Sequence, residues 1–161
     1  MNIETAKNLF IERGILHKET TLLEKPTVVG YEKKFKWSWM ATQLNTFVVV
    51  SDYQDEPITT SILKAHLAET YQYATIYYKG WPRGLQAGIA ILSVLISSQV
   101  DQGAKDYCLQ LASGKKWAGF CIPVVYDTHK GKFYYFQKKP MWGRIYFPYF
   151  RNMIRALETS K

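Results

Sequence analysis

Cys121, Asp127 and His129 are the residues of this chain whose types most directly suggest covalent catalysis. A thiol with a nearby imidazole and carboxylate can act as an activated nucleophile. Cys121 and Asp127, however, belong to one predicted strand, and their spacing along it separates them by about 20 Å. We therefore expect Cys121, like Cys108, to be a small buried hydrophobic residue rather than a nucleophile.

Three acids, Asp52, Asp55 and Glu56, follow a strand that we predict over 46–51. Loops at the carboxyl ends of such strands often hold ligands, and neighbouring carboxylates can serve acid–base or magnesium chemistry. Together with Arg83 in one cleft, these acids would make a small-molecule enzyme. The simpler interpretation is a solvated loop in which Asp55 caps the next helix, and we prefer it.

No arrangement of residues in the sequence predicts a metal or a cofactor. The histidines, His17, His66 and His129, are far apart, and the two cysteines lack zinc-type spacing. The segment GWPRG at 80–84 lacks the glycine spacing of a nucleotide-binding loop. We expect His66 to pack in the core and His17 to lie in a loop.

The strongest candidate for a ligand-binding surface is the last third of the chain, which is both basic and aromatic. The chain has a formal net charge of +8, and residues 128–161 contain eight lysines and arginines but a single acid, Glu158. Clustered positive charge attracts anions, and exposed rings between cations suit nucleic-acid bases and phosphates. The candidate binding residues are Trp81, Arg83, Lys138, Lys139, Trp142, Arg144, Arg151 and Arg155.

The spacing of apolar residues predicts a single domain over 1–161 with helices packed on a mixed sheet of about five strands. The segment 31–39 alternates, with Tyr31, Phe35, Trp37 and Trp39 on one face, as in a strand with one buried side. We predict helices at 4–13, 55–78, 101–112 and from about 148, and strands at 31–39, 46–51, 88–97, 118–126 and 132–137. A crossover helix between the second and third strands makes them parallel, and the last two form a hairpin, which gives an α+β fold.

From residue 46 onward this order of elements resembles the thioredoxin-like fold. The stretch IPVVYDTHKGKFYYF at 122–136 is similar to that family's tail, where a proline precedes a strand, a glycine-containing turn and a second strand. The resemblance implies that the first helix and strand are an extension. It also implies that Pro123 is the family's proline, usually cis, beside the active site. The family's redox CxxC has no counterpart, because SDYQDEPITT at 51–60 contains no cysteine, which argues against thiol–disulfide chemistry.

The aromatic residues also suggest that the chain associates with itself. In the closing hairpin, Tyr134 and Phe136 face opposite Phe133 and Tyr135, so both faces are aromatic. The last helix can cover one face, and a partner chain or another helix must cover the other. With the tyrosine-rich helix around 71–78, this predicts a non-catalytic protein that acts by protein–protein contact, as a homo-oligomer such as a dimer. Nucleic-acid or polyanion binding through the tail, and the small-molecule enzyme, remain the alternatives.

The composition argues against secreted and membrane-spanning proteins. Two cysteines cannot make a disulfide framework. The first residues, MNIETAKNLF, lack the charged start and apolar region of a secretion signal. The longest apolar run, at 87–96, is about half the roughly 20 residues that a membrane-spanning helix needs. We expect a cytoplasmic protein without a membrane segment.

Overall fold

The computed structural model describes residues 1–82, 86–110, 119–138 and 144–160, which form a six-stranded sheet with four helices. In chain order the elements are α1 (Ile3–Glu12), β1 (Leu16–Leu22), β2 (Lys25–Lys36), the 3-10 helix η1 (Trp37–Trp39), β3 (Thr42–Asp52), α2 (Thr60–Ile76), β4 (Ala87–Ser97), α3 (Gln102–Gln110), β5 (Gly119–Asp127), β6 (Lys132–Tyr134) and α4 (Phe147–Thr159). The fold is α+β, as predicted.

The strands lie in the sheet in their sequence order, from β1 to β6. β1, β2 and β3 are antiparallel neighbours, β3, β4 and β5 are parallel, and β6 pairs antiparallel with β5. The predicted parallel pair and the closing hairpin are therefore confirmed. β1 is the strand that the sequence pattern missed, because it lies at the sheet edge and consists mainly of exposed polar residues, LHKETTL.

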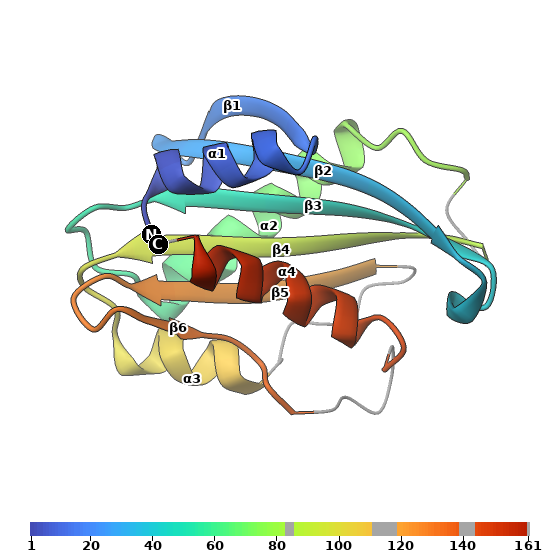
Figure 1. Ribbon diagram of the computed structural model, residues 1–161. Helices are drawn as coiled ribbons and strands as arrows, with labels where there is room; N and C mark the ends of the chain where they lie inside the picture. Colours follow the sequence, from blue (N-terminus) through green and yellow to red (C-terminus); the bar gives the residue numbers. More distant parts are fainter. Residues whose placement is uncertain (83–85, 111–118, 139–143, 161) are drawn as a thin grey trace.

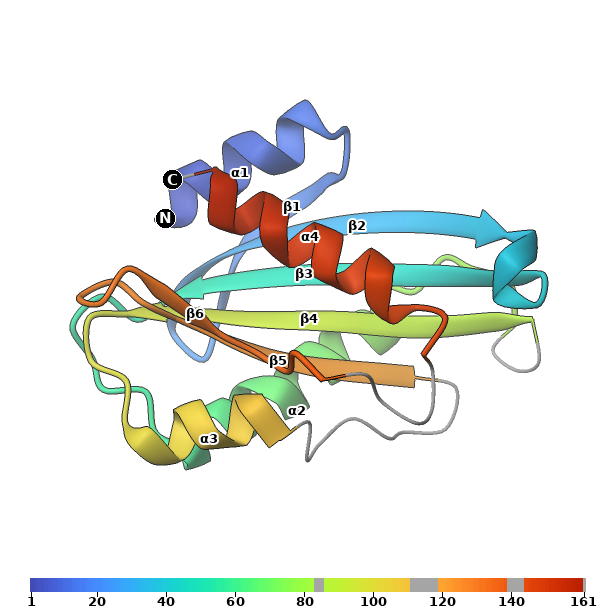
Figure 2. The same cartoon turned by 60° about the horizontal axis from the view of Figure 1, so that its bottom comes forward.

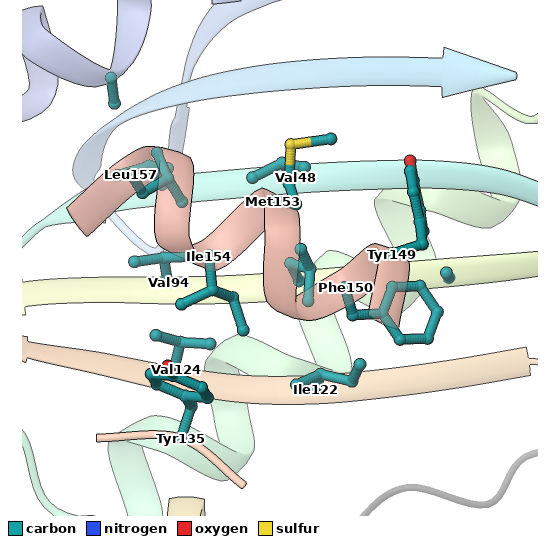
Figure 3. Close-up of a cluster of buried hydrophobic side chains, with 14 of the residues drawn as sticks. Val48, Val94, Ile122, Val124, Tyr135, Tyr149, Phe150, Met153, Ile154 and Leu157 are labelled. Atoms are coloured by element: carbon teal, nitrogen blue, oxygen red, sulfur yellow. The ribbon is translucent and has the colours of Figure 1, made fainter. Parts of the chain in front are cut away.

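Two helices cover each face of the sheet (Figures 1 and 2): α1 and α4 lie on one side, α2 and α3 on the other. Even-numbered residues of the inner strands face α4, and Figure 3 shows that helix lying over Val48 and Val94 with Ile154 directed toward the sheet. Odd-numbered residues such as Phe47 and Ile91 belong to the second core, against α2 and α3. This alternation determines which face of the sheet each side chain occupies.

α1 packs closely on β2 at Gly30. A Cβ atom added there would lie 3.2 Å from the ring of Phe10, which is fully buried. Gly14 follows the helix with φ +64°, a left-handed conformation that glycine adopts at no steric cost. α1 therefore ends beside β2, with Arg13 as its C-terminal cap.

The start of α2 differs from the prediction that Asp55 caps it. Thr59 is the cap, and its Oγ1 accepts a hydrogen bond from the Ile62 amide at 3.3 Å. Asp55 lies in the preceding turn and accepts from Ser98 Oγ at 2.7 Å. The helix begins later than expected because Ile58 first forms a β-bridge with Val100.

The aromatic residues of the closing hairpin are covered within one chain. Phe133 and Tyr135 lie in the core beneath α4, with 5% and 8% of their surfaces exposed. Tyr134 lies on the other face, packed against the second core near α3. Phe136 contacts Phe147 of α4 edge to face, with ring centres 5.8 Å apart. The second face of the hairpin, which either a partner chain or another helix had to cover, is therefore covered by α3 of the same chain. The hairpin gives no argument for association.

From β3 onward the elements follow the order on which the thioredoxin-like resemblance rests. That order alone does not confirm a thioredoxin-like topology. The peptide bond before Pro123 is trans, as is every peptide bond of the described residues, whereas the family's proline is usually cis.

Candidate nucleic-acid interface

β2 and β3 continue beyond α1 and α4 at the end of the sheet where η1 joins them (Figures 1 and 2). In β2, the residues from Thr27 to Gly30 are buried, whereas those from Tyr31 to Lys36 are half-buried or exposed. The connection after η1 places Met40 and Ala41 in the left-handed region, at φ 56° and 54°. We refer to residues 31–46 as the hairpin end; aromatic and basic side chains occupy both of its faces.

One face of the hairpin end carries three exposed aromatic rings. Phe35, Trp37 and Trp81, which we name the ring cluster, expose 40%, 82% and 48% of their surfaces. The ring centre of Phe35 is 5.3 Å from that of Trp37 and 6.0 Å from that of Trp81. The Trp81 amide donates to Gln43 Oε1 at 3.2 Å, which holds the segment before β4 against the hairpin. Contiguous exposed rings of this kind mark interaction sites.

Lysines accompany the ring cluster. Lys33 shares a face of β2 with Phe35, and its Nζ lies 3.5 Å from the carbonyl oxygen of Lys79. None of the ion pairs within the described ranges involves Lys33 or Lys79. Their charges therefore remain available to an anion beside the rings.

The opposite face of the hairpin end forms a cleft of about 330 Å³ against α4. Its polar wall consists of Arg13, Glu32, Lys34, Lys36, Ser38 and Asn152. The β2 residues come from even positions, which share one side of the strand. The ends of α1 and β2 thus bring three cations and one carboxylate into a single cleft.

Within this cleft, Glu32 is bound to both Tyr149 and Lys34. The Tyr149 hydroxyl donates to Glu32 Oε2 at 2.6 Å, and Lys34 Nζ lies 3.4 Å from Glu32 Oε1. Figure 3 shows Tyr149 in the first turn of α4, with its hydroxyl extending past β3 on the side of β2. Burial, and then the hydrogen bond to Glu32, raise the pKa of Tyr149, so the phenol stays protonated at neutral pH.

Aromatic rings support the two cleft lysines. Lys34 Nζ lies 5.3 Å from the ring centre of Tyr149, and Lys36 Nζ lies 5.0 Å from that of Trp39. Trp39 itself is buried and contacts Tyr149 edge to face, at 5.4 Å between ring centres. These cation–π contacts hold the ammonium groups at the cleft wall.

The binding residues proposed from the sequence are dispersed. Trp81 belongs to the ring cluster, and Arg144 is exposed directly before Ile145, which lines the cleft. Lys138 and Arg155 are exposed but line neither the cleft nor the ring cluster. The remaining candidates, Arg83, Lys139 and Trp142, lie outside the described residues.

Arg151, one of the predicted binding residues, forms hydrogen bonds within its own chain. Its Nη2 donates to the carbonyl oxygens of Gln137 and Lys138, the latter at 2.9 Å. These bonds fasten the segment after β6 to α4. The sequence could not reveal this, because backbone carbonyls accept hydrogen bonds whatever residue carries them.

The third hypothesis requires Arg83 beside the acids after β3, and Arg83 lies outside the described residues. Asp52 accepts from the Gln54 amide at 2.9 Å, and Glu56 pairs with Lys25. Gln43 at the start of β3 binds Trp81, so the acids and the segment around Trp81 lie at opposite ends of the strand, about 30 Å apart. Gln86 is also at the far end, where its carbonyl oxygen accepts from the Gln43 amide at 2.9 Å.

The candidate nucleophile is not assembled either. Cys121 is buried in the second core, and Asp127, at the other end of β5, forms an ion pair with Lys105 at 3.0 Å. His129 is exposed. Burial raises the pKa of the Cys108 thiol to about 12, so it stays protonated at neutral pH. Both cysteines are thus buried hydrophobic residues, as predicted.

The remaining histidines are structural. His66 is fully buried, as predicted, with Nδ1 2.7 Å from Ser93 Oγ and Nε2 2.7 Å from Ser51 Oγ. Burial lowers the pKa of His66 to about 4. His17 lies in β1 rather than in a loop, edge-on to aromatic rings that include Tyr77, and burial lowers its pKa as well.

The ring cluster and the cleft contain residues that the sequence reasoning assigned elsewhere. The alternation in 31–39 placed Phe35 and Trp37 on a buried strand face, and they are exposed because no helix of the described residues covers that face of the hairpin end. The available signal was the segment KKFKW itself, which interleaves cations and rings as densely as the C-terminal tail does.

Comparisons with family models, with curated proteins and with solved structures find no match to this chain. Within the described ranges, no helix combines the length and apolar character needed to cross a membrane. The same residues contain no group of three or more histidines, cysteines or acids placed to hold a metal ion.

Proposed function

We propose that this protein binds single-stranded nucleic acid at the hairpin end. The observation that carries the proposal is the ring cluster: three exposed aromatic rings, of which Phe35 contacts both Trp37 and Trp81, with lysines beside them that make no ion pair in the described ranges. The sequence predicted a polyanion-binding surface in the C-terminal tail. The proposed surface is the ring cluster instead, and it includes Trp81 from the predicted binding residues.

Exposed rings favour single strands over duplexes, because unpaired bases are free to stack on them. Base–aromatic stacking is worth about 1–3 kcal/mol per base, and it tolerates any base because each has a π-face. The ammonium groups of Lys33 and Lys79 would pair with phosphates on either side of the stacked bases. Such pairing releases counterions and makes affinity fall steeply with salt.

A titration of the full chain with a fluorescently labelled oligothymidylate at low salt tests the proposal. Trp37→Ala removes the most exposed ring, and we expect affinity to fall by about 5- to 100-fold, the equivalent of one lost stacking contact. Leu109→Ala, an exposed apolar residue on α3, is the control and should leave affinity unchanged. Equal affinities for both variants, or no binding at low salt, would refute the proposal.

Self-association is the competing use of the same rings. The tyrosines at 71–78, in α2 and just after it, do not support it, because Tyr73 is buried and Tyr71, Tyr77 and Tyr78 pack against the second core of their own chain. Sedimentation of the wild type and of Trp37→Ala separates the two functions. A dimer that Trp37→Ala dissociates would assign the ring cluster to contact between copies and count against nucleic-acid binding; a monomer in both would support our proposal.

A further inference from the structure

We propose that the cleft between β2 and α4 is a binding site for a phosphate group that is either free or attached through a single ester bond. Three cationic side chains, Arg13, Lys34 and Lys36, line it together with one carboxylate, Glu32. The wall therefore has a net charge of about +2, which matches the charge of roughly −1.5 to −2 that a phosphate monoester carries at neutral pH. The inference depends on the proposed function in one respect only, which is the source of the phosphate.

The carboxylate does not block an anion, because its charge is already engaged. Glu32 accepts from the Tyr149 hydroxyl at 2.6 Å through Oε2, and Lys34 approaches Oε1 at 3.4 Å. The second contact is long for a charge-assisted hydrogen bond, so Lys34 retains donors for a stronger acceptor. A single carboxylate also makes the cleft a poor site for a metal cation, which prefers several oxygen ligands.

Arg13 has only a weak hydrogen-bond partner in the cleft. Its Nη1 donates to the thioether sulfur of Met153 at 3.4 Å, and thioether sulfur is a poor acceptor. A guanidinium has five donors in a planar fork, a geometry that pairs with two phosphate oxygens at once. The exposed side chains of Ser38 and Asn152, on the same wall, supply neutral donors.

The start of α4 adds to the positive potential. Pro148 and Tyr149 of its first turn line the cleft, and this turn contains no acid and no side-chain cap. The positive end of the helix dipole therefore adds to three cations. An anion bound between these positive groups would reduce their mutual repulsion, whereas a further cation or a neutral ligand would not.

The same chemistry has two possible sources: the 5′-phosphate at the end of a nucleic-acid strand, or a free phosphate such as inorganic phosphate. The ring cluster and the cleft occupy opposite faces of β2, with Phe35 between Lys34 and Lys36 in the chain. A strand that passes around η1 would reach both faces. Binding of each source can be measured separately.

The test is an amide NMR titration of the full chain with inorganic phosphate at low ionic strength, together with affinity measurements on 5′-phosphorylated and 5′-hydroxyl oligothymidylate. We expect phosphate to shift the amide resonances of residues 13, 34–38 and 149–153. Lys34→Gln and Arg13→Gln should each weaken phosphate binding by about tenfold, the effect of one charge-assisted hydrogen bond. Lys64→Gln, an exposed lysine on α2, makes the same charge change on the other side of the sheet and should change phosphate affinity less than twofold.

The outcomes distinguish the sources and the two proposals. Tighter binding of the 5′-phosphorylated strand, with the difference lost in Lys34→Gln, supports the site and identifies a strand end. Equal binding of both strands, with phosphate binding that depends on Lys34, supports the site and identifies a free phosphate. Phosphate binding without any oligonucleotide binding would support the cleft while refuting the proposed function. Phosphate that shifts no cleft resonance, or binds Lys34→Gln as tightly as Lys64→Gln, would overturn the inference.

Discussion

The hydroxyl of Tyr149 donates a hydrogen bond to Glu32 across 117 residues of sequence, at 2.6 Å. It joins the first turn of α4 to the part of β2 that extends beyond α1. Trp39 reinforces the junction, because it packs against both Tyr146 and Tyr149. The hairpin end is thereby fixed to α4, and the cleft between them keeps its shape.

Removing this hydrogen bond should destabilise the protein. Tyr149→Phe leaves the Glu32 carboxylate without its closest donor while preserving the buried ring, and we expect a loss of about 1–3 kcal/mol in the free energy of unfolding. Glu32→Gln keeps an acceptor for the hydroxyl and should lose less. Urea denaturation at pH 7 measures both. A Tyr149→Phe variant as stable as the wild type would show that the bond does not fix the junction.

His66 should make the protein less stable in mild acid. Its pKa is about 4 in the folded protein and about 6.5 when unfolded, so the unfolded chain binds the extra proton between these values. Stability is therefore greatest above pH 6.5 and falls by about 3 kcal/mol as pH decreases to 4. His17, whose pKa is also lowered, adds to the same trend.

Denaturation between pH 7 and pH 4.5 measures this effect. His66→Gln should flatten the pH dependence, whereas His129→Gln, at an exposed position, should leave it unchanged. If the wild type is equally stable at both ends of this range, His66 is not held neutral by its burial between Ser51 and Ser93.

The buried ion pair of Lys105 and Asp127 should be costly to break. Both side chains are almost fully buried, and Nζ lies 3.0 Å from Oδ2. Burial alone would raise the pKa of Asp127, but hydrogen bonds from Lys105 and from the Lys130 amide, with the charge of Lys105, lower it. Lys105→Met removes these favourable terms and leaves a buried charge, and we expect a loss of about 3–5 kcal/mol.

A double-mutant cycle tests this pair. Lys105→Met combined with Asp127→Leu should be more stable than Lys105→Met alone, because no charge is then left buried. Urea denaturation of the four proteins gives the coupling energy. Additive losses, with no recovery in the double variant, would contradict the assignment.

Trp37 and Trp39 offer a direct contrast between an exposed residue proposed for binding and a core residue. Trp37 is 82% exposed and Trp39 is 3% exposed, although they are two positions apart. Trp39→Ala should cost about 3–5 kcal/mol of stability through the cavity that it leaves, whereas Trp37→Ala should change stability by less than about 0.5 kcal/mol. Thermal or urea unfolding measures both. A Trp37→Ala variant that is strongly destabilised would mean that the ring supports the fold.

The sequence predicts the elements whose own apolar pattern determines them. β4 is apolar on both faces and α4 has a clear apolar stripe, and both are found where expected. β1 escapes prediction because an edge strand is stabilised by its backbone pairing with β2, which leaves little trace in side-chain pattern. The alternation of β2 is correct for the faces of Phe35 and Lys34, but whether a helix covers a face depends on the whole fold.

The candidate site was out of reach of sequence reasoning for a related reason. The cleft combines Arg13, Lys34 and Asn152 from three distant parts of the chain, and no local sequence motif indicates that these residues lie close together. The C-terminal tail was predicted to bind anions because it is basic, yet the Arg151 side chain donates hydrogen bonds to backbone carbonyl oxygens. A surplus of charge predicts an anion-binding protein better than it predicts the binding residues.

Photo-crosslinking tests the account most directly. An oligothymidylate carrying 4-thiothymidine, bound to the full chain at low salt and irradiated, should attach to peptides that contain residues 33–40 and 79–82, as mass spectrometry would show. Added salt should reduce the yield steeply, as phosphate–lysine pairing requires. Crosslinks confined to α2, α3 or β1, or none at low salt, would contradict the hairpin end as the nucleic-acid interface.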